Sequence, residues 1–139
     1  MPSLTRPTRI AIVDDDPVFL ELMSDLLGDG EGYEVLTSYD WPNSQRFVAA
    51  AQPDLVILDL MMGREQSGWV VLDQLRADPA TRDVPVILCS AAVPALDRHA
   101  ARLREDAVRT LSKPFDVDDL LRLVSSLVSE ARPKELQAT

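Results

Sequence analysis

Four short apolar runs, each followed at once by polar residues, constrain what this chain can fold into. The runs and their polar ends are 10–13 with Asp14 and Asp15, 55–58 with Asp59, 86–89 with Ser90, and 108–112 with Lys113. The continuous run of branched residues at 55–58 is typical of a strand covered on both faces. In an open parallel sheet, ligands bind outside the carboxyl ends of the strands. We therefore expect three acids, a hydroxyl and an ammonium to meet in one crevice.

The stretches between these runs carry apolar residues at helical spacing. Asp16 and Pro17 favour a helix start, since an N-cap acid precedes a proline at the first helical position, and the pattern continues until Gly28. Further elements are predicted as helices over 43–52, over 68–77, from 94 and from 117, with a short strand at 33–36. Five strands alternating with five helices predict a doubly wound (βα)5 α/β sandwich, with a parallel five-stranded sheet in the order 2-1-3-4-5.

Length and charge narrow the class of protein. The 139 residues, 46% of them hydrophobic, suit one domain, which we place at 9–130 between tails at 1–8 and 131–139. The formal charge of −9 repels nucleic-acid phosphates and anionic lipid, so neither direct DNA binding nor membrane insertion is expected. The lone Cys89 excludes an internal disulfide and fits a reducing compartment. We expect a soluble, cytoplasmic protein.

The acids expected in this crevice suit a metal-assisted reaction of a phosphoryl group. Crowded carboxylates repel one another, and a hard divalent cation such as Mg²⁺ relieves the repulsion. We assign direct metal ligation to Asp15 and Asp59, with Asp14 orienting a metal-bound water. A carboxylate such as Asp59 is also a competent nucleophile toward phosphorus, because aspartyl-phosphate formation is an established form of covalent catalysis. Lys113 and Ser90 would then hold the remaining phosphoryl oxygens.

With these residues in view, the chain resembles the receiver domains of bacterial two-component response regulators. The resemblance spans roughly 9–130 and depends on the acidic pair Asp14-Asp15, on Asp59, on Ser90 and on Lys113. It implies a flavodoxin-like fold, Asp59 as the phosphoacceptor, Ser90 as the switch hydroxyl and Lys113 as the phosphoryl-binding lysine. It also implies that the backbone carbonyl of Met61, two residues after the acceptor, binds Mg²⁺.

The resemblance further implies partners. A histidine kinase or a phosphotransfer protein would donate the phosphoryl group to Asp59, and the domain would catalyse only this transfer and its later hydrolysis, so it is not a conventional enzyme. Because no output domain follows residue 130 in this sequence, we expect a stand-alone receiver. Its signal would pass to an unknown downstream protein through the face formed by the fourth helix, fifth strand and fifth helix.

Three positions depart from the pattern of that family. Gly63 stands where a proline is usual, and the usual glycine, Gly68, comes one residue later, which lengthens the loop. Thr110 stands where receivers usually carry the tyrosine or phenylalanine that moves inward with the switch hydroxyl. The alternative is therefore a constitutive interaction module, pseudo-receiver-like, that kept the site while its switch decayed.

Two other classes of protein share part of this pattern. Phosphatases resembling haloacid dehalogenases attack from the first strand with an Asp-x-Asp arrangement, and they need a cap or inserted loops that this chain lacks. Flavodoxin-like electron carriers share the strand order, but they wrap the phosphate of FMN in a hydroxyl-rich loop after the first strand. The acids at 14–16 would repel that phosphate.

Overall fold

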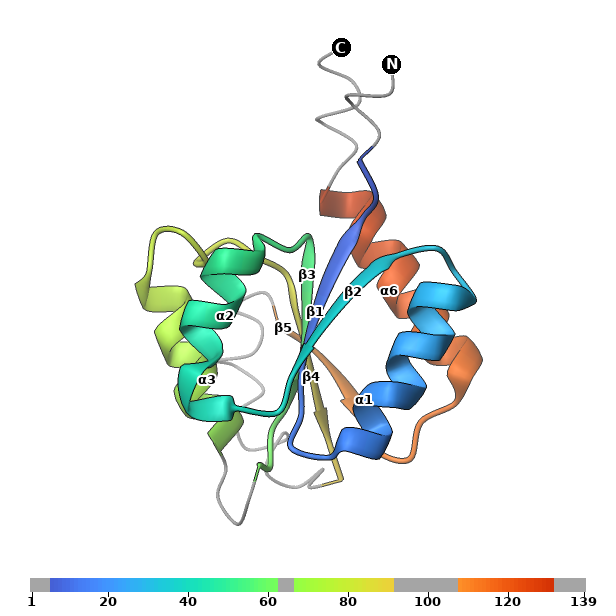
Figure 1. Cartoon of the computed structure of the whole chain (residues 1–139), viewed down its shortest axis with the longest axis horizontal. Helices are drawn as coiled ribbons and strands as arrows, with labels where there is room; N and C mark the ends of the chain where they lie inside the picture. The colour runs from blue at the N-terminus through green and yellow to red at the C-terminus, as the bar shows by residue number, and fades with distance from the viewer. Residues whose placement is uncertain (1–5, 63–66, 92–107, 132–139) are drawn as a thin grey trace.

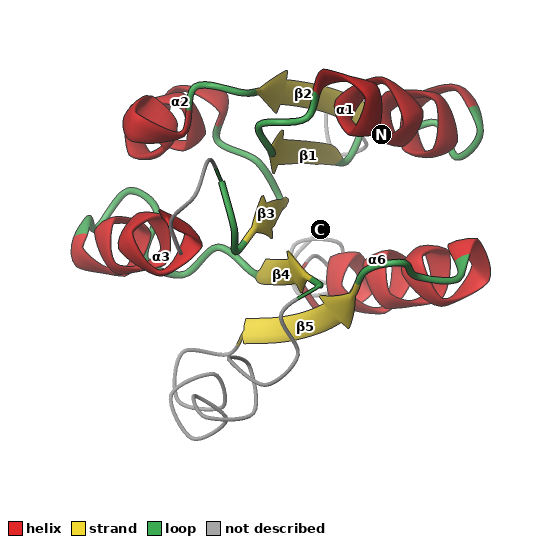
Figure 2. Cartoon of the chain, turned by 90° about the horizontal axis from the view of Figure 1, so that it is seen from below, coloured by secondary structure: helices red, strands yellow, loops and turns green. Residues whose placement is uncertain are grey.

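The computed structural model describes residues 6–62, 67–91 and 108–131, except for the side chains of Ser90, Glu130 and Ala131. A five-stranded parallel sheet has the order β2-β1-β3-β4-β5, which confirms the predicted topology (Figure 1). The strands are β1 (Arg9–Val13), β2 (Glu34–Ser38), β3 (Leu55–Asp59), β4 (Val86–Ser90) and β5 (Val108–Ser112). The carboxyl ends of all five strands therefore lie at one edge of the sheet, and Figure 2 looks onto that edge.

Helices cover both faces of the sheet. On one face lie α2 (Ser44–Ala51), which follows the 3₁₀ turn η3 (Trp41–Asn43), and α3 (Ser67–Ala77). On the other lie α1 (Pro17–Met23), continued by the π-helical turn η2 (Ser24–Asp29), and α6 (Val117–Ala131) (Figure 2). The helix predicted from Pro94 falls outside the described residues. The fold is thus the doubly wound sandwich that the sequence predicts.

One predicted boundary agrees with the structure to within one residue, and one differs. The first helical segment ends at Asp29, next to the predicted stop at Gly28, but its last part is a π turn that begins at Ser24, whose hydroxyl donates to the Leu20 carbonyl (2.9 Å). Such back-bonding competes with the helical ladder and bends it. The second strand extends to Ser38, beyond the predicted 33–36, because its backbone stays in register with β1 as far as Val13. Pairing between strands, which a local pattern does not contain, decides this length.

The core consists of two layers, one on each side of the sheet. Alternate residues of one strand belong to different layers: in β1, Ile10 and Ile12 pack with α1 and α6, whereas Ala11 and Val13 pack with α2 and α3. This is the period of two expected of a strand covered on both faces. The buried central strands explain why their sequences are continuously apolar.

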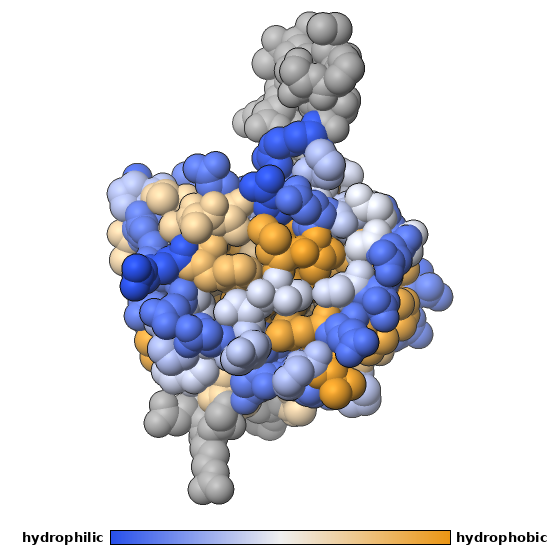
Figure 3. All heavy atoms as spheres, viewed as in Figure 1, coloured by the Kyte–Doolittle hydropathy of each residue, from blue (hydrophilic) through white to orange (hydrophobic). Residues whose placement is uncertain are grey.

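The surface is mixed in character. Figure 3 shows hydrophobic groups in the middle of the face along which β2 runs in Figure 1, bordered by hydrophilic ones. Val35 and Leu36 of β2 are half-buried, and Val18 and Leu22 of α1 are exposed. Within 6–62, 67–91 and 108–131, no helix has the length and hydropathy needed to span a bilayer.

Candidate functional site

Adjacent strands bring the acids together. Asp14 follows β1 directly and Asp59 ends β3, and these strands pair with Val13 opposite Leu58. The backbone amide of Asp14 also donates to the Ser38 carbonyl at the end of β2 (3.2 Å). Carboxylate oxygens of Asp14, Asp15 and Asp59 all lie within 4.8 Å of one another. The cluster expected from the apolar runs therefore forms.

The three acids differ in exposure. Asp14 is 2% exposed and Asp59 is 7% exposed, whereas Asp15 is exposed at the rim. One oxygen of Asp14 accepts a hydrogen bond from the backbone amide of Asp16 (3.0 Å), and Asp16 in turn caps α1 through the amide of Val18 (3.0 Å). Helix α1 and the Asp14 carboxylate are thus oriented by the same short turn.

Lys113 reaches the acids from the far side of β4. It follows β5, two strands from β3, and its long side chain places Nζ 2.8 Å from Asp14 Oδ2 and 3.6 Å from Asp59 Oδ1. The same Nζ lies 4.2 Å from the centroid of the Phe19 ring, which comes from the first turn of α1. The lysine therefore lies between two carboxylates and one aromatic ring.

Charge crowding changes the ionisation of this site. Burial raises the pKa of the Asp59 carboxyl to about 6; the charges of Asp14 and Asp15 add to the rise, and Lys113 and the Met61 amide oppose it. Burial alone would lower the pKa of Lys113, but the hydrogen bond and charge of Asp14, with the charge of Asp59, outweigh burial and raise it. Lys113 therefore stays charged at neutral pH. The ionised form of Asp59, in contrast, is disfavoured in the folded protein.

The donor set fits a hard divalent cation. Three carboxylates supply oxygen ligands only, which suits Mg²⁺ rather than metals that prefer nitrogen or sulfur. Burial first, and then the charges of Asp14 and Asp15, raise the pKa of Asp59 despite the opposing charge of Lys113, so excess negative charge is disfavoured at this site. A bound cation would remove this excess, since an opposite charge favours the ionised form.

The remaining predicted site residues are placed as follows. Ser90 is the last residue of β4, at the same edge, but its side chain lies outside the described part. Met61 is half-buried, and its amide donates to Asp59 Oδ1 (3.3 Å). Thr110 lies in β5, paired opposite Leu88, with an exposed side chain. Gly63 lies outside the described residues.

Two residues near the site make contacts that the sequence did not predict. Gly68 packs so tightly on β3 that an added Cβ would lie 2.6 Å from the Asp59 carbonyl oxygen and from Leu60 Cα. Its amide donates to the Leu60 carbonyl (2.9 Å), so α3 lies directly against the backbone at Asp59 and Leu60. From the sequence, Phe19 is one of several apolar residues at helical spacing. That spacing does not reveal a contact with residue 113.

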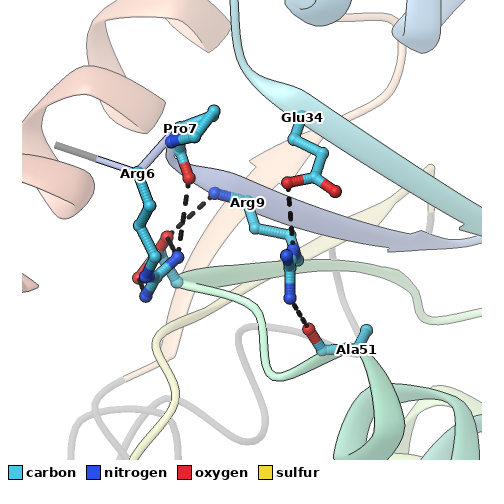
Figure 4. A network of polar contacts seen from close by, with 6 residues as sticks. Arg6, Pro7, Arg9, Glu34 and Ala51 are labelled. Atoms are coloured by element: carbon cyan, nitrogen blue, oxygen red, sulfur yellow. Dashed lines mark hydrogen bonds and ion pairs between the residues drawn. The ribbon is translucent and has the colours of Figure 1, made fainter. Parts of the chain in front are cut away.

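The opposite edge of the sheet carries a second polar cluster (Figure 4). The Arg6 guanidinium donates to both oxygens of Asp54 (3.0 and 2.8 Å), and the Arg9 amide donates to the same carboxylate (2.8 Å). The Arg9 side chain donates to Glu34 (3.2 Å) and to the Ala51 carbonyl (2.6 Å). These contacts tie the start of β1 to the segments that begin β2 and β3.

Comparison with known proteins agrees with the fold. Residues 10–125 match the family described as the response regulator receiver domain. The DNA-binding dual master transcriptional regulator RpaA of Synechocystis is 37% identical over 120 residues, which cover 86% of this chain and 48% of RpaA. The response regulator PleD of Caulobacter vibrioides is 35% identical over 136 residues, which cover 91% of this chain and 29% of PleD. The chain thus spans about half or less of these relatives.

Solved structures show the same architecture. The signal receiver domain of a signal transduction histidine kinase from Syntrophus aciditrophicus superposes with a TM-score of 0.75 at 28% identity, over 90% of this chain and 92% of that one. The signal receiver domain of an HD domain-containing protein from Pseudomonas fluorescens reaches 0.77 at 24% identity, over 94% and 93% of the two chains. At 24% identity, the similarity to the Pseudomonas fluorescens domain is evidence for the fold alone.

Proposed function

Since this chain belongs to the receiver domains of response regulators, we propose that Asp59 accepts a phosphoryl group from a phosphohistidine donor. One observation carries this proposal: Asp59 is nearly buried at the end of β3, with two further carboxylates within 4.8 Å and an ammonium 3.6 Å away. This is the charge pattern that an aspartyl-phosphate site needs.

In the proposed transfer, an oxygen of Asp59 forms a bond to phosphorus. The bond from phosphorus to the donor imidazole nitrogen breaks, and its electron pair stays on that nitrogen. Lys113 binds a phosphoryl oxygen, and the hydrogen bond from its Nζ to Asp14 (2.8 Å) holds it charged and in reach. We assign Ser90, at the end of the neighbouring strand β4, to a further oxygen.

A metal completes the proposed site. Held directly by Asp15, Asp59 and the Met61 carbonyl, and by Asp14 through water, Mg²⁺ would supply the positive charge that neutralises the phosphoryl oxygens. The donor set and the raised pKa of Asp59 support this assignment. Receiver domains are phosphoacceptors rather than conventional enzymes, and here the groups that assist both transfer and hydrolysis belong to the acceptor itself.

Partners and setting follow from the same proposal. A histidine kinase or a phosphotransfer protein would be the donor, and residues 9–130 would form the receiver. The charge of −9 supports a protein rather than DNA as the direct partner of these residues. Burial raises the pKa of the Cys89 thiol to about 12, so this cysteine stays unionised inside the sheet. A cytoplasmic setting is part of the same proposal.

A second candidate depends on Thr110. Its side chain is exposed on β5 and carries no ring to report phosphorylation, so a constitutive interaction module remains the alternative. Amide spectra recorded before and after phosphorylation distinguish the two functions. Shifts that spread along β5 favour a switch, and shifts confined to the carboxyl ends of β1 and β3 favour the module. The helix-four part of the proposed output face lies outside the described residues.

Incubation of the chain with Mg²⁺ and acetyl phosphate tests the proposed function. We expect one phosphoryl group per chain by intact mass, labile to hydroxylamine, and none on Asp59→Asn. Asp16→Asn is the matched control, because asparagine also caps helices and residue 16 lies outside the acidic cluster. Absence of the adduct on the unmodified chain, or its persistence in Asp59→Asn, would rule the proposal out.

A further inference from the structure

Phe19 of α1 lies against the lysine of the candidate site and against a neighbour of that lysine. Lys113 Nζ is 4.2 Å from the Phe19 ring centroid, well inside the roughly 6 Å range of a cation–π contact. Phe115, two residues after Lys113, meets the same ring nearly at right angles, with centroids 6.0 Å apart and an interplanar angle of 79°. One ring of α1 thus contacts two residues, Lys113 and Phe115, of the segment that follows β5.

The contact joins parts of the chain that share no strand pairing. Phe19 stands on the first turn of α1, whose start is set by the Asp16 cap, and Lys113 follows the edge strand β5. Asp14, just before the cap, holds the other side of the same ammonium at 2.8 Å. The turn from β1 into α1 therefore presents both a carboxylate and an aromatic ring to one lysine.

The environment makes this contact stronger than an exposed one. The Lys113 side chain is 24% exposed and the Asp14 side chain 2% exposed, so little water competes for the ammonium. Cation–π attraction grows as the cation is desolvated. The ring also carries no net charge, so its attraction for the lysine is the same whether or not a phosphoryl group adds negative charge at Asp59.

We infer that Phe19 is a positioning residue that confines the Lys113 ammonium between Asp14 and Asp59, ready to bind a phosphoryl oxygen. Leucine at this position would fill similar space but would lack the negative ring face. The lysine would then sample positions farther from Asp59, and the phosphoryl transition state would lose part of its stabilisation. This inference depends on the proposed phosphoryl transfer for its kinetic consequence but not for its geometry.

The geometry is tested without any phosphodonor. The chain has two lysines, Lys113 and Lys134, so protein carrying ¹³C-labelled lysine gives two ε-methylene signals, which Lys134→Arg assigns. We expect an upfield ring-current shift of the Lys113 signal that disappears in Phe19→Leu and returns in Phe19→Tyr. An unshifted Lys113 signal in the unmodified chain would overturn the inference, whatever the outcome of phosphorylation.

The kinetic consequence is tested with acetyl phosphate and Mg²⁺. Phe19→Leu should slow phosphorylation by about three- to tenfold, the range that a partly desolvated cation–π contact allows. Phe19→Tyr should restore the rate to within about twofold, since the ring face is kept. Leu22→Ala, an exposed change on the same helix, is the matched control and should leave the rate unchanged.

A double-mutant cycle separates positioning from general damage to α1. In a Lys113→Met background, where phosphorylation is followed over longer times, Phe19→Leu should have no further effect, because it acts through the lysine. An equal loss in both backgrounds would show a merely structural role and overturn the inference. A chain that shows the ring-current shift but accepts no phosphoryl group would refute the proposed function and leave the placement of Lys113 standing.

Discussion

The two ends of the sheet carry polar clusters that are built on opposite principles. At the amino ends, Arg6 and Arg9 face Asp54 and Glu34, so cations and carboxylates are matched in number and joined by hydrogen bonds of 2.8 to 3.2 Å. At the carboxyl ends, two nearly buried carboxylates, Asp14 and Asp59, share the ammonium of Lys113.

The difference teaches which cluster serves folding and which serves chemistry. In the amino-end cluster, each arginine is paired with a carboxylate, so the charges neutralise one another and the hydrogen bonds hold the strands together. At the carboxyl end, burial first, and then the charges of Asp14 and Asp15, raise the pKa of Asp59, so its ionised form is disfavoured on folding and a bound cation can relieve this. Three experiments test this contrast, from the largest expected effect to the smallest.

Asp54→Ala should destabilise the protein by about 2 to 3 kcal/mol, because it removes the hydrogen-bond partner of Arg6 and of the Arg9 amide. The Arg6 pair contributes the smaller part, since the Arg6 side chain is partly exposed and water weakens the attraction. Urea unfolding measures the loss, and Mg²⁺ affinity should not change. Asp29→Ala, an exposed change at the end of η2, is the control and should stay within about 0.5 kcal/mol. If Asp54→Ala lowered the free energy of unfolding by less than about 0.5 kcal/mol, a structural role for the amino-end cluster would be contradicted.

Mg²⁺ should stabilise the protein through the carboxyl-end cluster alone. At ten times the dissociation constant, binding should add about 1.4 kcal/mol to the free energy of unfolding. Thermal unfolding with Mg²⁺ and with EDTA measures the gain. It should shrink in Asp15→Asn and persist in Asp54→Ala. An equal gain in Asp15→Asn would remove Asp15 from the proposed ligands.

The pH dependence of stability without metal should show the penalty at Asp59. Its folded pKa, about 6, lies above the ordinary value of 3.8, so the folded state binds the proton more tightly. This contribution to stability is therefore present at low pH and is lost as pH rises from about 4 through 6. Between pH 7.5 and 5, the unmodified protein should gain about 1 kcal/mol relative to Asp59→Asn, measured by urea unfolding in EDTA.

If the free energy of unfolding of the unmodified protein and of Asp59→Asn changed equally with pH, the raised pKa of Asp59 would be contradicted. Asp59→Asn should also be more stable than the unmodified protein at pH 7.5 without metal, because it removes a carboxylate beside Asp14. A less stable variant would mean that Lys113 already compensates the Asp59 charge. The two clusters would then not differ in the way described above.

Much of the fold was readable from local patterns. The apolar runs at β1, β3 and β4 are continuous because both faces of these strands are buried, and the cap Asp16 predicted the start of α1 correctly. The stop at Gly28 lies within one residue of the end of the helical segment, but the π turn from Ser24 onward was not predicted, since periodicity does not encode the backbone bonds there. The roles assigned to Ser90, Met61 and Thr110 stay predictions.

By itself, the sequence determined the strand order and the edge at which Asp14, Asp15, Asp59 and Lys113 meet, because polar residues that end parallel strands share an edge. Only the tertiary structure decided how those charges are balanced. Burial of Asp59 and the reach of Lys113 to Asp14 set the ionisation of the site, and the ring of Phe19 bounds the lysine. Distances and exposure govern electrostatic energies, and both arise from packing between segments far apart in the chain.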